Sequence, residues 1–256
     1  MTAKPAKPNY IIGINFLTFL FSALVVWSFL SGQYNRIEKE NLKPSSFDLP
    51  DNKDSDFFDL YLNCGLQGKL DYKIFKQALD GVNKYFLSNK QILSIIDFSK
   101  PSTQKRLFII DIADQKLLLE TLVAHGKGSG TNLPTRFSNK VGSNQSSLGF
   151  FRTAETYFGK HGYSLILDGL EKGINDNARR RAIVIHGAKY VSKNFIKCYN
   201  RLGRSWGCPA VSEDLSEKII NIIKGGTCLF IYSDKEDYYE KSIVFNSYFK
   251  PHIQAN

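Results

Sequence analysis

The chain of 256 residues lacks several motifs that would place it in a common class of metal-binding or nucleotide-binding protein. Its four cysteines, Cys64, Cys198, Cys208 and Cys228, form no C-x-x-C pair, which argues against a zinc ribbon or a thioredoxin-like motif. The glycine-rich stretch 125–130 lacks the spacing G-x-x-x-x-G-K-[ST], and no helix signal follows it. We therefore expect a flexible loop there rather than a phosphate-binding loop. No internal repeat is visible.

Acidic residues are scarce relative to basic ones. The chain has 24 Asp and Glu against 34 Lys and Arg, which gives a net charge of +10. This positive charge favours binding to an anionic partner such as acidic lipid, a carboxylate-rich wall polymer or nucleic acid. The alternative is that the charge serves only to keep the protein soluble. Nucleic-acid binding would require the basic residues to be interleaved with aromatic ones on one surface. We expect most of the basic run between 172 and 204 to be a solvated face, and no nucleic-acid partner.

Near the N-terminus, charge is missing altogether from Ile11 to Leu30. Twenty apolar residues in a helix span a bilayer core of about 30 Å. No convincing A-x-A-like cleavage site follows, so an uncleaved anchor is favoured over a cleaved signal peptide, with a buried soluble helix as the remaining alternative. Lys4 and Lys7 before the span agree with an N-terminus that stays inside. The rest of the chain is then expected to be extracytoplasmic, on the periplasmic or cell-wall face, anchored in the inner membrane by residues 11–30.

Composition and periodicity predict five segments: an anchor or signal segment (1–32), a linker (33–56), a helical segment (57–100), a main domain (101–234) and a C-terminal tail without an assigned role (235–256). Within the helical segment, apolar residues recur at helical spacing from Ile74 to Phe86. Asp71 is the expected N-cap, with Leu70 and Phe75 placed as a hydrophobic staple. This apolar stripe is expected to pack on the main domain.

Short apolar runs bounded by turn residues dominate the rest. A hairpin and four further strands are expected, in the ranges Leu107–Ile112, Leu117–Val123, Phe150–Phe158, Tyr163–Leu170, Ala182–Ile185 and Thr227–Tyr232. A helix is expected over Leu215–Lys224, opened by Asp214 with Glu217 in capping-box position, and ended by Gly225-Gly226. This pattern predicts a mainly β fold, a mixed β-sandwich, with an N-terminal helical segment and a few short helices.

Two residues in this domain have the requirements of thiol chemistry. His186 ends a short apolar strand, and Cys208 lies between Gly207, which permits a sharp turn, and Pro209, which fixes its own φ. A thiolate is a nucleophile, and a nearby imidazole can accept the thiol proton. The alternatives are a buried structural thiol and a hydrogen-bonded histidine at a strand end.

The order His186-Gly187, a gap, then Ser205-x-Gly207-Cys208 resembles the active-site signature of the L,D-transpeptidases, the YkuD-like enzymes of bacterial cell-wall metabolism. The stretches L-V-A-H-G-K-G-S-G, L-D-G-L-E-K-G-I-N-D-N-A and G-R-S-W-G-C-P-A resemble the murein L,D-transpeptidase catalytic domain branch, over roughly residues 90–232. The resemblance also implies the β-sandwich fold. Better-known members carry His or Arg where this chain has Trp206, and Arg where it has Ala210.

The resemblance implies that Cys208 forms an acyl-enzyme with a peptidoglycan tetrapeptide stem, releases D-Ala and passes the acyl group to an amine. His186 would be the base, oriented by the Gly187 carbonyl, and the backbone N–H groups of Gly207 and Cys208 would stabilise the oxyanion, with Ser205 holding the loop. Hydrolysis by water, or a non-catalytic cell-wall-binding role, remains open.

For substrate contacts, the expected residues are His125, Trp206 and Arg204. No cofactor or metal is expected. The alternative is a zinc site made from His125, His161, His186 and Cys208, but these spacings match no known metal motif.

Overall fold

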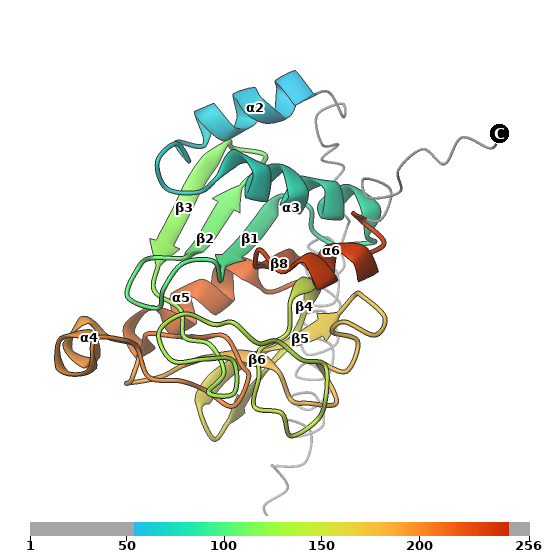
Figure 1. The fold of residues 1–256 in the computed structure, drawn as a ribbon. Helices are drawn as coiled ribbons and strands as arrows, with labels where there is room; N and C mark the ends of the chain where they lie inside the picture. The colour runs from blue at the N-terminus through green and yellow to red at the C-terminus, as the bar shows by residue number, and fades with distance from the viewer. Residues whose placement is uncertain (1–53, 246–256) are drawn as a thin grey trace, which may run out of the picture. The chain divides into compact units, whose positions relative to one another are not determined.

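A mixed sheet of eight strands forms the centre of the computed structural model, which describes residues 54–245 (Figure 1). The strand order is β3-β2-β1-β8-β4-β5-β6-β7. Their ranges are β1 Ile92–Asp97, β2 Leu107–Asp111, β3 Lys116–Thr121, β4 Gly149–Gly159, β5 Gly162–Gly169, β6 Val184–Gly187, β7 Ala210–Val211 and β8 Cys228–Tyr232. The predicted mainly β fold with a few short helices is confirmed, and the eight strands are joined by one continuous series of hydrogen-bonded ladders.

Strands β1 and β8 are the buried centre of the sheet. They run parallel, and all five residues of β8 and five of the six in β1 are buried. A strand covered on both faces shows a continuous apolar run instead of alternation. The prediction that residues 57–100 form a helical segment is therefore wrong at its end, because the helix stops at Lys84 and Ile92–Asp97 is a central strand of the sheet.

The long strand β4 carries the sheet from this centre towards its other edge. Its residues 149–152 pair with β8, and its residues 151–159 pair with β5, with a register shift between Thr153 and Thr156. Beyond β5 lies β6, which pairs in parallel with the two-residue strand β7 through His186 opposite Ala210 and Gly187 opposite Val211. The two sequence motifs, 22 residues apart at His186 and Cys208, are thus brought to the same edge of the sheet.

Helix α3, Tyr72–Lys84, follows α2, Asp54–Asn63, and packs on β1 and β8. Its predicted N-cap is confirmed, since the Asp71 carboxylate accepts a hydrogen bond of 2.7 Å from the backbone N–H of Lys73. Leu70 and Phe75 are both buried, as expected for a staple. Phe86, which the periodicity included in the apolar stripe, lies beyond the helix and is 86% exposed.

Helix α5, Glu213–Ile223, packs on β6, β5 and β1. Its N-cap is Ser212, so the prediction that Asp214 opens the helix is wrong. Glu213 and Asp214 instead lie in the first turn, where their negative charge is favourable beside the helix N-terminus. The Gly225-Gly226 stop is confirmed, because both glycines follow the C-cap with positive φ, 93° and 84°. Between β6 and β7 the chain forms α4, Lys193–Tyr199.

The start of the predicted tail is part of the core. Residues 236–241 form α6, and Tyr238 and Phe245 are buried. The buried carboxylate of Glu171 holds this segment, because it accepts hydrogen bonds from the Tyr238 hydroxyl at 3.1 Å and from the Ser242 hydroxyl, as well as from the Phe150 N–H at 2.8 Å. Glu171 belongs to the L-D-G-L-E-K-G stretch singled out in the sequence, so this stretch has a structural role in fixing α6 to the sheet.

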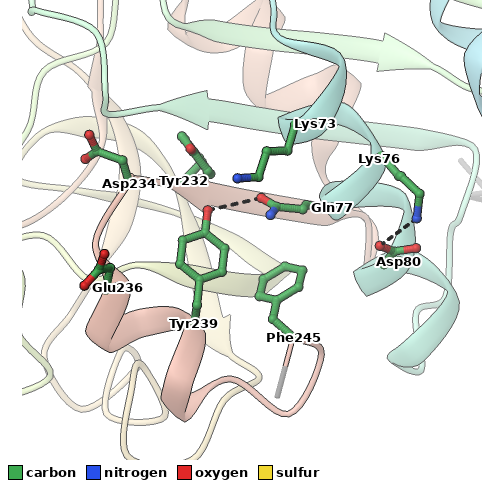
Figure 2. A pocket seen from close by; sticks show the side chains of 9 residues that line it. All are labelled: Lys73, Lys76, Gln77, Asp80, Tyr232, Asp234, Glu236, Tyr239 and Phe245. Carbon is green, nitrogen blue, oxygen red and sulfur yellow. Dashed lines mark hydrogen bonds and ion pairs between the residues drawn. The ribbon is translucent and has the colours of Figure 1, made fainter. Parts of the chain in front are cut away.

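A cavity of about 540 Å³ lies between α3 and α6 (Figure 2). The Tyr239 hydroxyl donates to Gln77 Oε1 across it at 3.2 Å, and Phe245 forms part of the wall. No predicted site residue lines this cavity, so it is separate from the chemistry considered below.

The predicted membrane anchor at residues 11–30 lies outside the described residues, as does most of the linker 33–56. Among residues 54–245, no helix has the length and apolar character needed to cross a bilayer.

Candidate active site

Cys208 lies on a tight turn that leads into β7, and Gly207 makes that turn possible. Gly207 has φ of 129°, which side chains rarely adopt. An added Cβ would lie 2.9 Å from the carbonyl oxygen of Gln145 and 3.2 Å from Ile183 Cδ1. The position before Cys208 therefore requires glycine for both its conformation and its close packing.

Ser205 closes the turn with two hydrogen bonds. Its hydroxyl donates to the Cys208 carbonyl at 2.6 Å and accepts from the Gly207 N–H at 3.1 Å. The expected role in holding the loop agrees with this geometry. The expected role of Gly207 as an oxyanion donor does not, because its N–H is already bound to Ser205.

The thiol of Cys208 rests against the backbone that leads into β6. Its Sγ accepts from the Val184 N–H at 3.5 Å and lies 3.4 Å from the Ala182 carbonyl, to which the thiol donates. Val184 is two residues before His186, so the two side chains share one face of the strand. The register of β6 and β7 also places His186 opposite Ala210, two residues after Cys208. The Cys208 turn and the strand that carries His186 therefore lie side by side.

Burial raises the pKa of the Cys208 thiol, while the Val184 N–H and the charge of Arg181 oppose this increase. The Arg181 guanidinium is held nearby by the carbonyls of Ser138 and Gln145, each at 2.5 Å. A half-buried thiol of raised pKa is protonated at neutral pH and needs a base in order to react.

His186 is suited to be that base. Its Nδ1 lies 2.9 Å from the Gly187 carbonyl oxygen, so Nδ1 carries the proton and Nε2 has the free lone pair. Burial lowers the pKa of His186, and the hydrogen bond to Gly187 partly offsets this. The imidazole is consequently neutral near pH 7, as a general base must be.

His125 does not lie where a substrate could contact it, so that prediction is wrong. The ring is fully buried, with Nδ1 2.9 Å from Arg106 Nη2 and Nε2 3.4 Å from the Gly130 carbonyl oxygen. Burial and the charge of Arg106 lower the pKa of His125 to about 3. The glycines around it suggested an exposed loop, but this loop pairs with the Cys208 turn, as the 2.8 Å bond from the Lys127 N–H to the Ser205 carbonyl indicates.

Arg204 and Trp206 flank Ser205 and differ in exposure. Arg204 Nη1 donates to the Gly130 carbonyl at 3.0 Å, which links the turn to the His125 loop. Trp206 is 73% exposed, and the Lys127 ammonium lies 5.3 Å from the centre of its ring. An exposed indole therefore lies two residues before Cys208, with the ammonium of Lys127 over its ring.

Ala210, where better-known members carry arginine, is a packing residue. It is fully buried with Ala124, Val191 and Leu202, and it forms backbone hydrogen bonds with Ala124. This site accommodates a methyl group, so any contact that an arginine would make at this position has to come from elsewhere.

The four residues of the alternative zinc site do not converge. His125 faces Arg106, whereas the His161 ring stacks on His186. Within residues 54–245, no three His, Cys, Asp or Glu residues are grouped so that they could hold a metal ion. All four cysteines are free thiols, with Cys198 exposed and Cys64 and Cys228 buried.

A family comparison decides the assignment: the model of the L,D-transpeptidase catalytic domain matches residues 66–232, about two thirds of the chain. The chain belongs to this L,D-transpeptidase family. The match begins before α3, earlier than the expected start near residue 90, which agrees with the packing of α3 on β1 and β8.

Solved structures of two L,D-transpeptidases and of a cell shape determining protein are similar to this domain at low sequence identity. An L,D-transpeptidase from Mycobacterium smegmatis is 12% identical, with a TM-score of 0.35 over 57% of this chain and 60% of that one. The cell shape determining protein Pgp2 from Campylobacter jejuni is 13% identical, with a TM-score of 0.40 over 64% of this chain and 55% of that one. The L,D-transpeptidase of Stackebrandtia nassauensis is 16% identical, with a TM-score of 0.34 over 71% and 78%. The chain thus spans less than two thirds of the first two relatives. No curated protein matches it.

Sequence reasoning gave no role to Arg106 or Arg181 in this L,D-transpeptidase domain, and it considered His161 only as a ligand of the alternative zinc site. Arg106 and Arg181 bind backbone carbonyls far away in the sequence, at Val123 and Gln145 among others. Nothing in their local sequence marks such partners. For His161, the G-K-H-G turn indicated a loop but not the residue that it would meet.

Proposed function

We propose that this protein is a peptidoglycan-modifying cysteine acyltransferase that acts by L,D-transpeptidation. Cys208 attacks the carbonyl of the diaminopimelate residue in a tetrapeptide stem, D-Ala leaves, and a thioester forms. The amine of a second stem then attacks the thioester and releases the thiol. The observation that carries the proposal is the convergence of Cys208 with His186 at the edge of the sheet, in a chain of this family.

In the first step, His186 Nε2 takes the thiol proton as Sγ bonds to the carbonyl carbon. The neutral state of His186 leaves Nε2 able to accept a proton, and the raised pKa of Cys208 means that the thiol needs such a base in order to react. The resulting imidazolium keeps its Nδ1–H on the Gly187 carbonyl and gives the Nε2 proton to the departing D-Ala amine. In the second step, the same nitrogen takes a proton from the attacking amine, and the thiol is restored.

The oxyanion requires a donor other than the Gly207 N–H, which is bound to Ser205. We assign this role to the N–H of Cys208. It belongs to the residue that carries the sulfur, and the following Pro209 has no N–H to offer. The Ser205 bonds to both sides of the turn fix the direction in which this N–H points.

Trp206 and Lys127 are the proposed contacts for the stem peptide. The indole offers an apolar face and an N–H, and the ammonium suits the carboxylates of the stem. Arg204 has further guanidinium donors beyond the one that binds Gly130, so it is a second candidate for a carboxylate.

The full chain incubated with disaccharide-tetrapeptide tests the reaction, with products separated by mass spectrometry. Transpeptidation predicts free D-Ala and a cross-linked dimer whose amount rises with acceptor concentration. Free D-Ala with tripeptide alone would instead establish the carboxypeptidase alternative. If Cys208→Ala binds sacculi like the parent and replaces it fully in cells, the protein is a wall-binding module.

The location of this chemistry is also part of the proposal. The uncharged segment 11–30 would anchor the enzyme in the inner membrane with residues 54–245 on the periplasmic or cell-wall face. Carbonate washing of membranes checks this: the full chain should stay in the pellet, and a chain that begins at residue 33 should be released.

A further inference from the structure

His161 lies at the tip of the β4–β5 hairpin, directly against the candidate base. Gly159 and Gly162 form the last pair of the two strands, which leaves Lys160 and His161 as the two-residue connection. Gly162, directly after this connection, has φ of 73°, a conformation that glycine adopts readily. The His161 ring stacks on the His186 ring, with centroids 4.4 Å apart and an angle of 26° between the planes.

The stack covers one face of a base that is otherwise enclosed. His186 is 3% exposed, and its Nδ1 is bound to the Gly187 carbonyl. His161 itself is exposed to solvent. The hairpin tip therefore separates the His186 ring from water without taking either of its nitrogens, because a ring stacked face to face cannot hydrogen-bond the ring below it.

Charge on His161 would also act on His186. After burial, the charge of His161 is the next factor that lowers the pKa of His186, since two imidazolium ions this close repel each other. Other titratable or charged groups on neighbouring elements include Cys208 before β7, Arg181 and Tyr190 beside it, and Glu213 in the first turn of α5 against Gly187. None of these groups stacks on the imidazole.

We propose that His161 is a positioning residue for the transfer of the thiol proton, and that it acts through His186. It fixes the plane of the His186 ring so that Nε2 stays directed at Cys208. It also shields that ring from water and favours its neutral form. The inference rests on the proposed function, in which His186 is the base. It assigns no bond-making step to His161 itself.

Two substitutions separate the parts of this role. His161→Phe keeps an aromatic ring on His186 but removes the charge, whereas His161→Ala removes both. Lys160→Ala is the matched control, because it changes the other residue of the same connection. His161 is exposed at a hairpin tip, and thermal unfolding of each variant would confirm that the fold is intact.

The proton on His186 can be followed without any substrate. The chain has four histidines, so histidine-selective ¹³C labelling of the full chain gives a simple spectrum that can be titrated. The pKa of His186 should rise by about 0.5 or more in His161→Phe, and by at least as much in His161→Ala, while Lys160→Ala leaves it unchanged. Identical titrations of His186 in the parent and His161→Phe would overturn the inference.

Acylation by the tetrapeptide, measured above the pH range of the His186 titration, gives the second readout. The acylation rate of His161→Phe should stay within about twofold of the parent rate. That of His161→Ala should fall about tenfold, because a base that is not directed at the thiol accepts its proton less efficiently. Equal rates in the parent and His161→Ala would refute the positioning role. If the parent forms no acyl-enzyme, the proposed function fails, and the titration still decides whether His161 controls His186.

Discussion

The Sγ of Cys208 lies 3.5 Å from the backbone nitrogen of Val184, two residues before His186 on the same strand. This relationship ties the thiol to the strand that carries the base, so movement of the turn relative to β6 separates the two. The chain holds the turn by hydrogen bonds within it and to neighbouring loops, and each of these contacts can be tested.

Ser205→Ala removes both hydrogen bonds that close the turn, to the Cys208 carbonyl and from the Gly207 N–H. The buried Gly207 N–H loses its partner, so we expect the free energy of unfolding to fall by about 1–3 kcal/mol and acylation to slow about tenfold or more. Urea unfolding and the acylation rate measure the two effects. Ser55→Ala, at an exposed serine outside the site, should change neither. An unchanged acylation rate in Ser205→Ala would mean that the turn is held by other contacts.

Gly207→Ala combines an unfavourable φ with a close contact to the Gln145 carbonyl. Gly225→Ala is the matched control, since Gly225 also has positive φ, 93°, but its Cβ would meet open space. We expect the control to lose about 1 kcal/mol of stability from backbone strain alone and to keep its activity. Gly207→Ala should lose more stability and nearly all acylation. Equal thermal unfolding and equal activity in the two variants would show that the packing around Gly207 tolerates a side chain.

The burial of His125 gives a pH dependence of stability. The folded pKa of about 3 lies below the ordinary value near 6.5, so the unfolded chain binds more protons between these two values. The stability contributed by neutral His125 is therefore present above pH 6.5 and is lost as the pH falls towards 3. Between pH 7 and pH 5 the loss is about 2 kcal/mol. His125→Gln should reduce the pH dependence of urea unfolding by that amount, and an unchanged dependence would mean that His125 titrates normally in the folded protein.

Glu171 links α6 to the sheet through buried hydrogen bonds to Phe150, Tyr238 and Ser242. Glu171→Ala leaves these donors without an acceptor and should cost about 3 kcal/mol or more, with faster proteolysis near residues 236–245. Glu171→Gln keeps an acceptor oxygen and should lose much less. Thermal unfolding with limited proteolysis distinguishes the two variants, and equal losses would argue that charge, not hydrogen bonding, holds α6.

Local patterns in the sequence predicted much of the fold. The apolar period and Asp71 predicted α3, and short apolar runs predicted the outer strands and the hairpin, because these signals depend on residues close together in the chain. The strand β1 was missed, since a short run buried on both faces lacks alternation and followed directly on a helical pattern. The start of α5 was misplaced because several polar residues in a row could serve as its N-cap.

The site was predictable as a pair of residues but not as a geometry. The order of the two motifs indicated Cys208 and His186. Two details depended on contacts between distant segments: the burial of His125 against Arg106 and the stacking of His161 on His186. Such partners are set by the register of the sheet, which no local pattern of the sequence contains.

The most direct test of the central claim is the intact mass of the full chain after incubation with disaccharide-tetrapeptide, with Cys208→Ala in parallel. The proposed mechanism predicts a mass gain equal to the substrate minus D-Ala in the parent and no gain in the variant, because the thioester needs the sulfur. A folded parent with a reduced thiol that gives neither an adduct nor free D-Ala would contradict it, as would the same adduct on Cys208→Ala.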